Sequence, residues 1–173
     1  MIRKATEKDL PYISQIYDDL HTLEEQGAVT IGWIRHIYPT SSTAAEALRR
    51  GDLFVEEDNG IVVGAAIINQ QQVDSYKKGT WNYNVPDQEV MVLHTLVISP
   101  NAARNGYGRS FVEFYEKYAL EHNCHYLRMD TNAINLRART MYKKLGYQEV
   151  GIVPTVFNGI ENVQLVLLEK YLQ

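Results

Sequence analysis

The sequence Ala103-Arg104-Asn105-Gly106-Tyr107-Gly108-Arg109 connects the mostly apolar run Val90 to Ile98 with a helical pattern that begins at Gly108 and ends near His122. The first N–H groups of a helix have no partner within the helix, and the macrodipole places partial positive charge beside them. The two glycines leave those donors open to a ligand, and the two arginines add positive charge. Strand, glycine loop and helix start therefore predict an anion site suited to a pyrophosphate.

Two other phosphate-binding loops fit this stretch less well. The dinucleotide fingerprint needs a third glycine, and the sequence from Gly106 to Phe111 lacks it. The triphosphate loop needs a Gly-Lys ending followed by Ser or Thr, which is also absent. A different nucleotide ligand stays open as an alternative. The deciding feature comes later in the chain, where a strand ends near Asp130 and a second helical pattern runs from Asn135 to Tyr147.

Three motifs in this order resemble the GNAT superfamily of N-acyltransferases, which use acetyl-coenzyme A. The family's loop, [Q/R]-x-x-G-x-[G/A], aligns with Ala103 to Gly108, and its strand motif L-x-V-x-P aligns with Leu96 to Pro100. The helix motif N-x-x-A-x-x-x-Y-x-x-x-G-[F/Y] aligns with Asn135 to Tyr147. Ala103 departs from the family's Gln or Arg, but backbone donors do most of the cradling and Arg104 could compensate.

The remaining chain alternates between strand and helix signals. Strands are predicted at 2–4, 53–57, 61–69, 90–98, 125–130, 147–153 and 163–169, and helices at 10–27, 43–51, 108–122 and 135–146. Asp58-Asn59-Gly60 predicts a hairpin turn, Thr6 to Asp9 a capping box, and 70–88 a long surface loop. The resemblance implies an α/β (α+β) GNAT fold: a mixed central sheet of about seven strands, helices on both faces, and splayed central strands that bind acyl-CoA. Residues 1–173 are expected to form a single domain.

Composition narrows the classes of partner. The formal net charge of −4 argues against nucleic acid as the main partner, because phosphate contacts need a basic face. We expect no membrane partner, because no apolar stretch is long enough to span a bilayer. The single cysteine, Cys124, cannot form an internal disulfide, and a cytoplasmic location is the default expectation. The sequence leaves open whether the chain is a monomer or a homodimer.

The resemblance also implies how the co-substrate acetyl-CoA is held, and it implies no metal. The pantetheine arm is expected to pair with the backbone of Leu96, Val97 and Ile98, since a splayed strand exposes unpaired N–H and C=O groups. The pyrophosphate is expected over the loop and helix start, which comprise Arg104, Asn105, Gly106, Tyr107, Gly108, Arg109 and Ser110. Asn135 is expected to contact the pantetheine arm, to cap its helix, or to do both.

Tyr142 is the candidate general acid. It stands where the family's tyrosine faces the coenzyme sulfur. A phenol with a pKa near 10 can donate a proton to a departing thiolate whose own pKa is about 8.5. The alternative is a buried structural tyrosine on an amphipathic helix beside Met141 and Leu145.

The base is open among three candidates. His94 interrupts an apolar strand, and strict alternation would place it on one face with Val92, Leu96 and Ile98. Some family members carry a histidine at this position, and an imidazole with an unperturbed pKa near 6.5 accepts a proton at neutral pH. A satisfied core histidine is the alternative. Glu89, at the start of the strand, is a second candidate, and ordered water is a third.

The acceptor is not readable from the sequence, although two segments are candidates for its pocket. These are 27–38 and 70–88, which lack periodicity and contain Trp33, Tyr38, Trp81 and Tyr83. We expect direct attack in a ternary complex by the primary amine of a small molecule. The alternatives are a protein or peptide N-acetyltransferase and a non-catalytic module that binds or senses acyl-CoA.

Overall fold

A computed structural model describes residues 1–173 and contains one seven-stranded sheet in the order β1-β2-β3-β4-β5-β7-β6. The strands are β1 (Ile2–Lys4), β2 (Leu53–Asp58), β3 (Ile61–Asn69), β4 (Val90–Ile98), β5 (Tyr126–Asn132), β6 (Gln148–Phe157) and β7 (Ile160–Tyr171). Only β4 and β5 pair in parallel, and every other neighbouring pair is antiparallel. The predicted mixed sheet is therefore confirmed.

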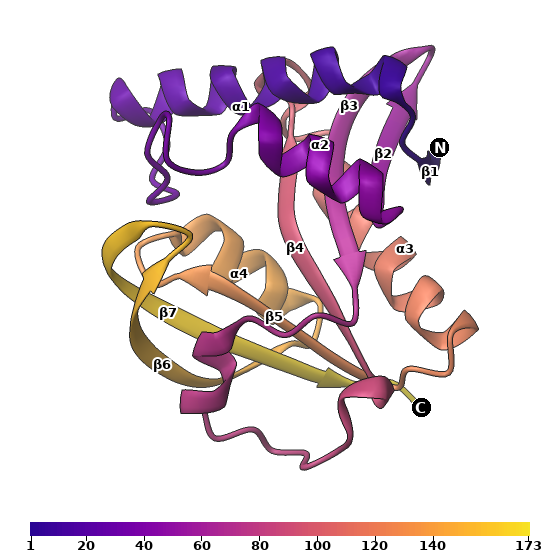
Figure 1. The fold of residues 1–173 in the computed structure, drawn as a ribbon, viewed down its shortest axis with the longest axis vertical. Helices are drawn as coiled ribbons and strands as arrows, with labels where there is room; N and C mark the ends of the chain where they lie inside the picture. Colours follow the sequence, from indigo (N-terminus) through magenta and orange to yellow (C-terminus); the bar gives the residue numbers. More distant parts are fainter.

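Four helices cover the sheet, namely α1 (Leu10–Glu25), α2 (Ser41–Arg50), α3 (Tyr107–Glu121) and α4 (Leu136–Lys144). Short 3-10 turns lie at η1 (Glu7–Asp9), η2 (Asp74–Lys78), η3 (Asp87–Glu89) and η4 (Pro100–Ala102). Helices α1 and α2 pack on one face of the sheet, whereas α3 and α4 pack on the other (Figure 1). The expected helices on both faces are confirmed. None of the helices combines the length and the apolar character that crossing a membrane requires.

Tyr115 ties α3 to the centre of the sheet. Its side chain is completely buried, and its hydroxyl donates to the carbonyl of Met91 in β4 at 2.7 Å and to that of Arg128 in β5 at 3.2 Å. A buried phenol that satisfies carbonyls on both strands holds them at a fixed separation beneath the helix. The two central strands are thus anchored together at one end.

At the other end, β4 and β5 separate. Their parallel pairing runs from Val90–Tyr126 to Leu93–Met129 and stops there, although β4 continues to Ile98 and β5 to Asn132. Beyond Leu93, the β5-facing side of β4 has no partner strand, so backbone N–H and C=O groups are left open to a ligand. The splayed central strands implied by the resemblance are present.

A β-bulge in β4 corrects one expectation. Between the pairs Ile67–His94 and Ala65–Val97, β4 contains one more residue than β3. Thr95, within this stretch, has a positive φ of 49°. The extra residue reverses the alternation of side chains from that point on. Leu96 therefore packs with the core under α3, as Met91 and Leu93 do, and His94 does not share a face with it. The predicted common face of Val92, His94, Leu96 and Ile98 is wrong for this reason.

Local signals account for most element ends. Asn59 and Gly60 both have positive φ, which confirms the predicted hairpin turn between β2 and β3. The capping box at Thr6 is also confirmed, because its backbone N–H donates to the Asp9 carboxylate at 2.7 Å. Helix α2 begins earlier than predicted: Thr40 is its N-cap, and Thr43 accepts from the Thr40 N–H at 3.0 Å.

The hairpin of β6 and β7 is longer than predicted. It turns at Asn158-Gly159, where both residues have positive φ. An Asn-Gly pair between strands is a strong turn signal, and the sequence analysis overlooked it.

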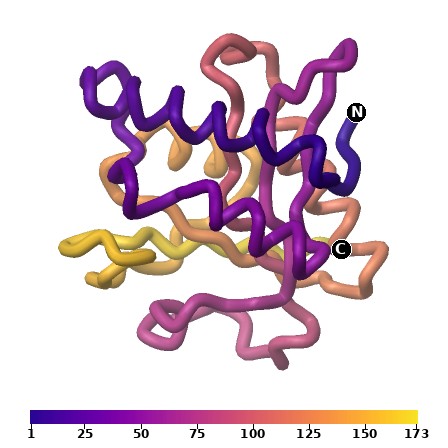
Figure 2. The backbone as a smooth tube through the Cα atoms, turned by 45° about the horizontal axis from the view of Figure 1, so that its top comes forward, coloured from indigo at the N-terminus to yellow at the C-terminus, as the bar shows by residue number.

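The predicted surface loop at 70–88 is more ordered than expected. It contains η2 and η3, and Tyr76 within it is 2% exposed. Figure 2 shows this segment as an excursion beyond the ends of the strands, beside the C-terminus. Arg128 of β5 fixes it by donating to the Gln72 side chain and to the Tyr83 carbonyl, each at 2.7 Å. A long-range clamp of this kind has no local sequence signal, so periodicity could not reveal it.

Candidate active site

The larger cavity of the molecule, of about 1050 Å³, occupies the gap where β4 and β5 separate. We call it the donor cavity. It is lined by the open edge of β4 from Thr95 to Ile98, the ends of β5 and η4, the start of α3, and α4. Most of its lining is apolar, with polar groups concentrated at the helix starts. A long ligand with amide groups in its middle and an anionic part at one end suits this shape and chemistry.

The start of α3 offers the groups that suit the anionic end of such a ligand. Gly106 is the N-cap with a φ of 83°, and Arg104 also has a positive φ of 70°. The N–H groups of Tyr107 and Gly108 have no partner in the protein, as expected for the first residues of a helix. Arg104 lines the cavity, is exposed and makes no ion pair. The predicted pyrophosphate site therefore has open N–H donors and one unpaired cation, and phosphate binding there stays a prediction.

Several side chains in this loop have other tasks. Arg109 forms an ion pair with Glu113 at 2.7 Å and is largely exposed, so its charge is already balanced. The Tyr107 hydroxyl donates to Asp58 and the Ser110 hydroxyl to Glu56, each at 2.8 Å, which anchors α3 to the β2–β3 hairpin. Asn105 and Ser110 do not line the cavity.

Gly108 has a packing role in addition to the predicted one. A Cβ atom at this position would lie 3.2 Å from the Met141 sulfur, so the glycine allows α3 to pack closely against α4. At Gly106 a Cβ would meet open space, and positive φ is the reason for glycine there. Arg137 of α4 is an additional cation that the sequence analysis missed. It is exposed, lines the donor cavity and has no ion-pair partner.

Helix α4 presents two predicted site residues to the donor cavity. Asn135 caps the helix by accepting from the Ala138 N–H at 3.2 Å, which leaves its side-chain NH₂ free to donate. Tyr142 is 7% exposed, and its hydroxyl makes no hydrogen bond yet is not sealed off in the core. Burial, and secondarily the negative charge of Asp130, raise the Tyr142 pKa above its usual range. The phenol is therefore protonated at neutral pH and able to donate.

A second cavity, of about 670 Å³, adjoins the first, and we call it the acceptor cavity. Its walls come from α2, the end of β3, the middle of β4 from Leu93 to Thr95, the segment after β3, Asp130 of β5 and the end of β6, and its lining is mostly polar. Five residues line both cavities: Tyr38, Leu93, Thr95, Asp130 and Phe157. The two cavities therefore meet at the point where β4 and β5 diverge, so a group bound in one can reach a group bound in the other.

The acetyltransferase (GNAT) family model matches residues 13–147. The chain belongs to this family. It is therefore an N-acetyltransferase enzyme, and the family's donor is acetyl-CoA. Among curated proteins, none matches the sequence.

Solved structures share the fold over nearly the whole chain. A GNAT-family acetyltransferase of Streptococcus agalactiae has a TM-score of 0.83 at 20% identity and covers 100% of this chain and 95% of its own. A ribosomal-protein-alanine N-acetyltransferase of Brucella melitensis reaches 0.73 at 21% identity, with 99% of each chain covered. A structure from Salmonella typhimurium that contains its cofactor acetyl-CoA reaches 0.71 at 17% identity, covering 100% and 94%.

A partly buried carboxyl group, that of Asp130, lies at the junction of the two cavities, and sequence reasoning missed it as a site residue. Asp130 accepts from the Tyr76 hydroxyl at 2.7 Å through one oxygen, and its other oxygen has no partner in the protein. Burial raises the Asp130 pKa to about 6, against the lowering effect of the Tyr76 hydrogen bond. An acidic residue at the carboxyl end of a strand beside the splay is the signal that could have identified it.

His94 lines the acceptor cavity but titrates differently from the expectation. Burial lowers its pKa to about 4, although the charge of Asp52 and the Gln71 carbonyl favour the protonated ring. The imidazole is therefore neutral at pH 7 and a weaker base than an unperturbed histidine. Its Nε2 makes a hydrogen bond of 2.8 Å with the Asn69 side chain.

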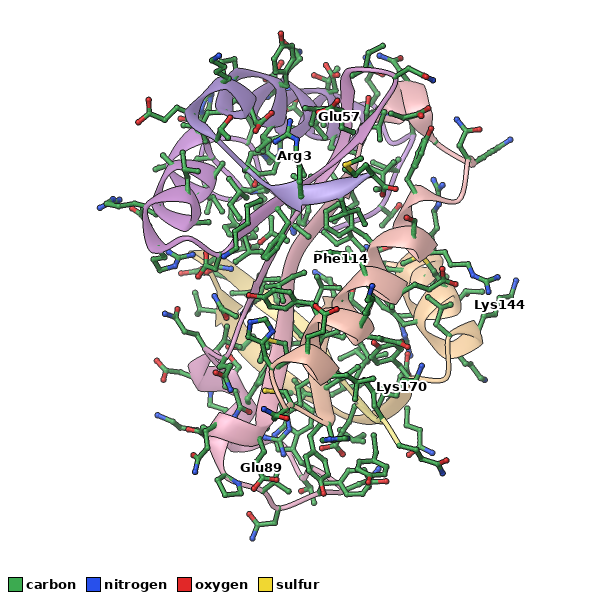
Figure 3. The ribbon with its side chains drawn as sticks, turned by 90° about the vertical axis from the view of Figure 1, so that its right-hand side faces the viewer. Arg3, Glu57, Glu89, Phe114, Lys144 and Lys170 are labelled. Atoms are coloured by element: carbon green, nitrogen blue, oxygen red, sulfur yellow. The ribbon has the colours of Figure 1, made fainter.

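Glu89 is not brought to the site. It is exposed at the start of β4 and lines neither cavity. Figure 3 shows it at the end of the molecule opposite Arg3 and Glu57, and Glu57 belongs to the hairpin against which α3 begins. Glu89 therefore lies away from both cavities of the acetyltransferase.

The four aromatic residues expected around the acceptor fall into two pairs. Trp33 and Tyr38 make an edge-to-face contact and line the donor cavity, and the Tyr38 hydroxyl is hydrogen-bonded to Thr95 at the junction. Trp81 and Tyr83 line neither cavity. Trp81 stacks on the Arg128 guanidinium, so it belongs to the clamp of the 70–88 segment, and its expected role in the acceptor pocket is wrong.

Proposed function

We propose that this acetyltransferase transfers an acetyl group from acetyl-CoA to the primary amine of a small polar molecule, by direct attack within a ternary complex. The observation that carries the proposal is the meeting of two cavities at Thr95 and Asp130. Donor and acceptor can be bound at the same time, and neither must leave before the other reacts. A covalent acyl-enzyme is not needed, and the one cysteine, Cys124, is buried outside both cavities.

The donor cavity fits acetyl-CoA along its length. The free N–H groups at the start of α3 and the unpaired charges of Arg104 and Arg137 suit the phosphates. The open edge of β4 from Leu96 to Ile98 suits the amides of the pantetheine arm, with the Asn135 side chain as a further donor. The thioester then lies at the divergence of the strands, beside Tyr142.

The proposed roles follow from protonation states. An amine enters mostly as its ammonium form and must lose a proton before its nitrogen attacks the thioester carbon. Asp130, with its pKa near 6 and one free oxygen at the junction, accepts that proton. As the carbon–nitrogen bond forms, the carbon–sulfur bond breaks and Tyr142 donates its proton to the leaving thiolate. The nitrogen loses its second proton as the amide forms, and this proton restores the phenol through solvent, so that only the proton taken by Asp130 is released.

The walls of the acceptor cavity favour a small acceptor over a folded protein, and its charges favour a cation. The acceptor cavity is walled on several sides, by α2, by the 70–75 segment and by the end of β6. Its carboxylates are Glu46, Asp130 and Asp74, of which Asp74 pairs with Lys77 at 3.3 Å, whereas its one arginine, Arg50, is paired with Asp52 at 2.9 Å. The cavity therefore attracts a cation, which an amine is at neutral pH.

The test is release of free thiol from acetyl-CoA across a panel of small amines, polyamines, amino acids and short peptides. We expect turnover with compact polar amines and saturation kinetics that show intersecting, not parallel, reciprocal lines. Turnover of peptides alone, with no small amine acetylated, would refute the small-molecule acceptor. Thiol release without added amine, or parallel lines, would refute direct attack.

A further inference from the structure

A chain of hydrogen bonds runs from the surface of α2 to His94 in the wall of the acceptor cavity. Arg50 donates to Asp52 through Nε at 2.9 Å and Nη2 at 3.2 Å, and Asp52 accepts from the Asn69 side-chain NH₂ at 2.9 Å. The Asn69 oxygen then meets Nε2 of His94 at 2.8 Å. Glu89, Tyr142 and Asp130 take no part in this chain, so the proposed chemistry leaves it unexplained.

The chain dictates the orientation of the Asn69 amide. A carboxylate can only accept hydrogen bonds, so the group of Asn69 that faces Asp52 must be NH₂. Its oxygen therefore faces the other way, where it also accepts from the backbone N–H of Gln71 at 2.9 Å. Turning the amide over would set NH₂ against the Gln71 N–H and the oxygen against a carboxylate, so neither of these two contacts would be a hydrogen bond.

This orientation fixes the proton on His94. Because the Asn69 oxygen can only accept, Nε2 of the neutral ring must carry the hydrogen, and Nδ1 must carry the lone pair. Nδ1 makes no hydrogen bond of good geometry with the protein and is not among the buried atoms that lack a partner, in a residue that lines the acceptor cavity. The Gln71 carbonyl, which lies near the ring, is the acceptor that would favour the opposite tautomer.

We infer that Asn69, held by Asp52 and Arg50, is a positioning residue that fixes His94 as the Nε2–H tautomer and so presents the Nδ1 lone pair to an N–H group of the acceptor amine. The role in catalysis rests on the proposed function, whereas the tautomer does not. A neutral acceptor at this wall complements the Asp130 carboxylate, because a primary amine keeps two N–H groups after it gives up a proton.

The first experiment measures the tautomer without any substrate. In protein labelled with ¹⁵N-histidine, two-bond proton–nitrogen spectra at pH 7 distinguish a protonated ring nitrogen from a bare one, and His94→Gln assigns the signals among the five histidines. We expect Nε2 protonated and Nδ1 bare. Asn69→Leu should populate both tautomers, because no fixed acceptor then faces Nε2, and far-UV circular dichroism checks that the variant is folded. Gln71→Leu, which alters a neighbouring amide without touching the chain, should change nothing.

The second experiment tests the role in turnover. Asn69→Leu should lower kcat/KM for the amine about tenfold, as loss of one oriented hydrogen bond does, and leave KM for acetyl-CoA unchanged. In a His94→Gln background the same substitution should have no further effect, because it acts through His94. A wild-type ring protonated at Nδ1, an unchanged tautomer in Asn69→Leu, or multiplying effects in the double variant would each overturn the inference. Absence of turnover with every amine would overturn the proposed function, and the spectra would still decide the tautomer.

Discussion

Two titratable residues near the junction of the cavities, Asp130 and His94, have pKa values in the reverse of their usual order. Burial raises the pKa of Asp130 to about 6 and lowers that of His94 to about 4, because a low-dielectric surrounding disfavours the charged form of each. The carboxyl group is thereby the stronger base of the two, which reverses the order expected for free side chains. The surroundings, and not the residue type, therefore set which of the two groups is the stronger base.

This ordering predicts the pH dependence of the reaction. For the wild-type enzyme we expect the acidic limb of kcat/KM for the amine to fall near pH 6, where Asp130 loses its proton. Asp130→Asn should lower kcat by about a hundredfold or more, as usual for loss of a general base, and should abolish this limb. His94→Gln should keep it. A limb that survives in Asp130→Asn would assign the base to another group.

The same substitution should stabilise the fold at neutral pH. The folded-state pKa of Asp130 is raised, so its favourable contribution is complete below pH 4 and is lost as the pH rises to about 6. Asparagine avoids burying the charge and can still accept from Tyr76. We expect Asp130→Asn to raise the free energy of unfolding at pH 7 by about 1–2 kcal/mol and to have little effect at pH 4. Urea unfolding at both pH values measures this, and a loss of stability at pH 7 would contradict it.

Substitution of Tyr142 should affect the rate of the chemical step without affecting the binding of CoA. Tyr142→Phe removes only a hydroxyl that has no partner in the protein, so folding and affinity for CoA should be retained. We expect kcat to fall by about a hundredfold if the phenol protonates the thiolate. Steady-state kinetics and calorimetry with CoA give the two quantities. Full turnover in this variant would make Tyr142 a core tyrosine, as its packing against Tyr147 would also allow.

At the scale of elements, the glycine loop and the β4 bulge are the two deviations from regular structure that build the donor cavity. The bulge at Thr95 turns the strand's outer half so that Leu96 and Ile98 pack toward the α3 core. Gly106 lets the chain enter α3 with its first N–H groups exposed. Both depend on a positive φ, which costs little for glycine and more for threonine. The threonine hydroxyl is used, since it is hydrogen-bonded to Tyr38.

Gly106 has a matched control in Gly51, which ends α2. Both residues have φ near 80°, and in both an added Cβ would meet open space. Gly106→Ala and Gly51→Ala should therefore each cost about 1 kcal/mol of stability through backbone strain alone. Only Gly106→Ala should weaken CoA binding, by about five- to tenfold, because only its loop orients the free N–H groups. Calorimetric titration decides, and equal CoA affinities would place the phosphates elsewhere.

At the scale of the molecule, the acceptor cavity depends on a segment held from a distance. Arg128 of β5 clamps the 70–88 segment, stacks on Trp81 at 4.3 Å, and lies 3.4 Å from the Glu169 carboxylate, itself 1% exposed. Part of that segment, Gln71 to Ser75, forms one wall of the acceptor cavity. Loss of the buried Arg128 guanidinium should therefore affect both the stability of the fold and the shape of the acceptor cavity.

This coupling predicts two separable effects. Arg128→Met should destabilise the protein by about 3 kcal/mol, because Glu169 is left buried without its cation. Adding Glu169→Gln should restore part of that stability. KM for the amine should stay raised severalfold in both variants, because the clamp on the wall is lost, while KM for acetyl-CoA stays near the wild-type value. An unaltered KM for the amine in the double variant would show that the wall holds its shape without Arg128.

The sequence by itself determined the local elements and the donor end of the site. Helix periodicity, the capping box at Thr6 and the Asp58–Gly60 turn depend on neighbouring residues, so they could be read directly. The family motifs likewise placed Gly106, Asn135 and Tyr142, since these depend on fixed spacing along one strand–loop–helix unit. Only the tertiary structure decided the rest. The bulge at Thr95 arises from the register between two strands and has no signal in the strand itself.

The geometry of the acceptor cavity also depends on contacts between residues distant in sequence. Asp130 and Tyr76 are 54 residues apart, and their hydrogen bond exists only because β5 and the segment after β3 meet in space. The burial that shifts the pKa of Asp130 and of His94 is a property of the packed surroundings, which one-dimensional patterns do not contain. Local interactions therefore specified the elements and the phosphate loop, whereas contacts distant in sequence specified where the cavities meet and which group there can take a proton.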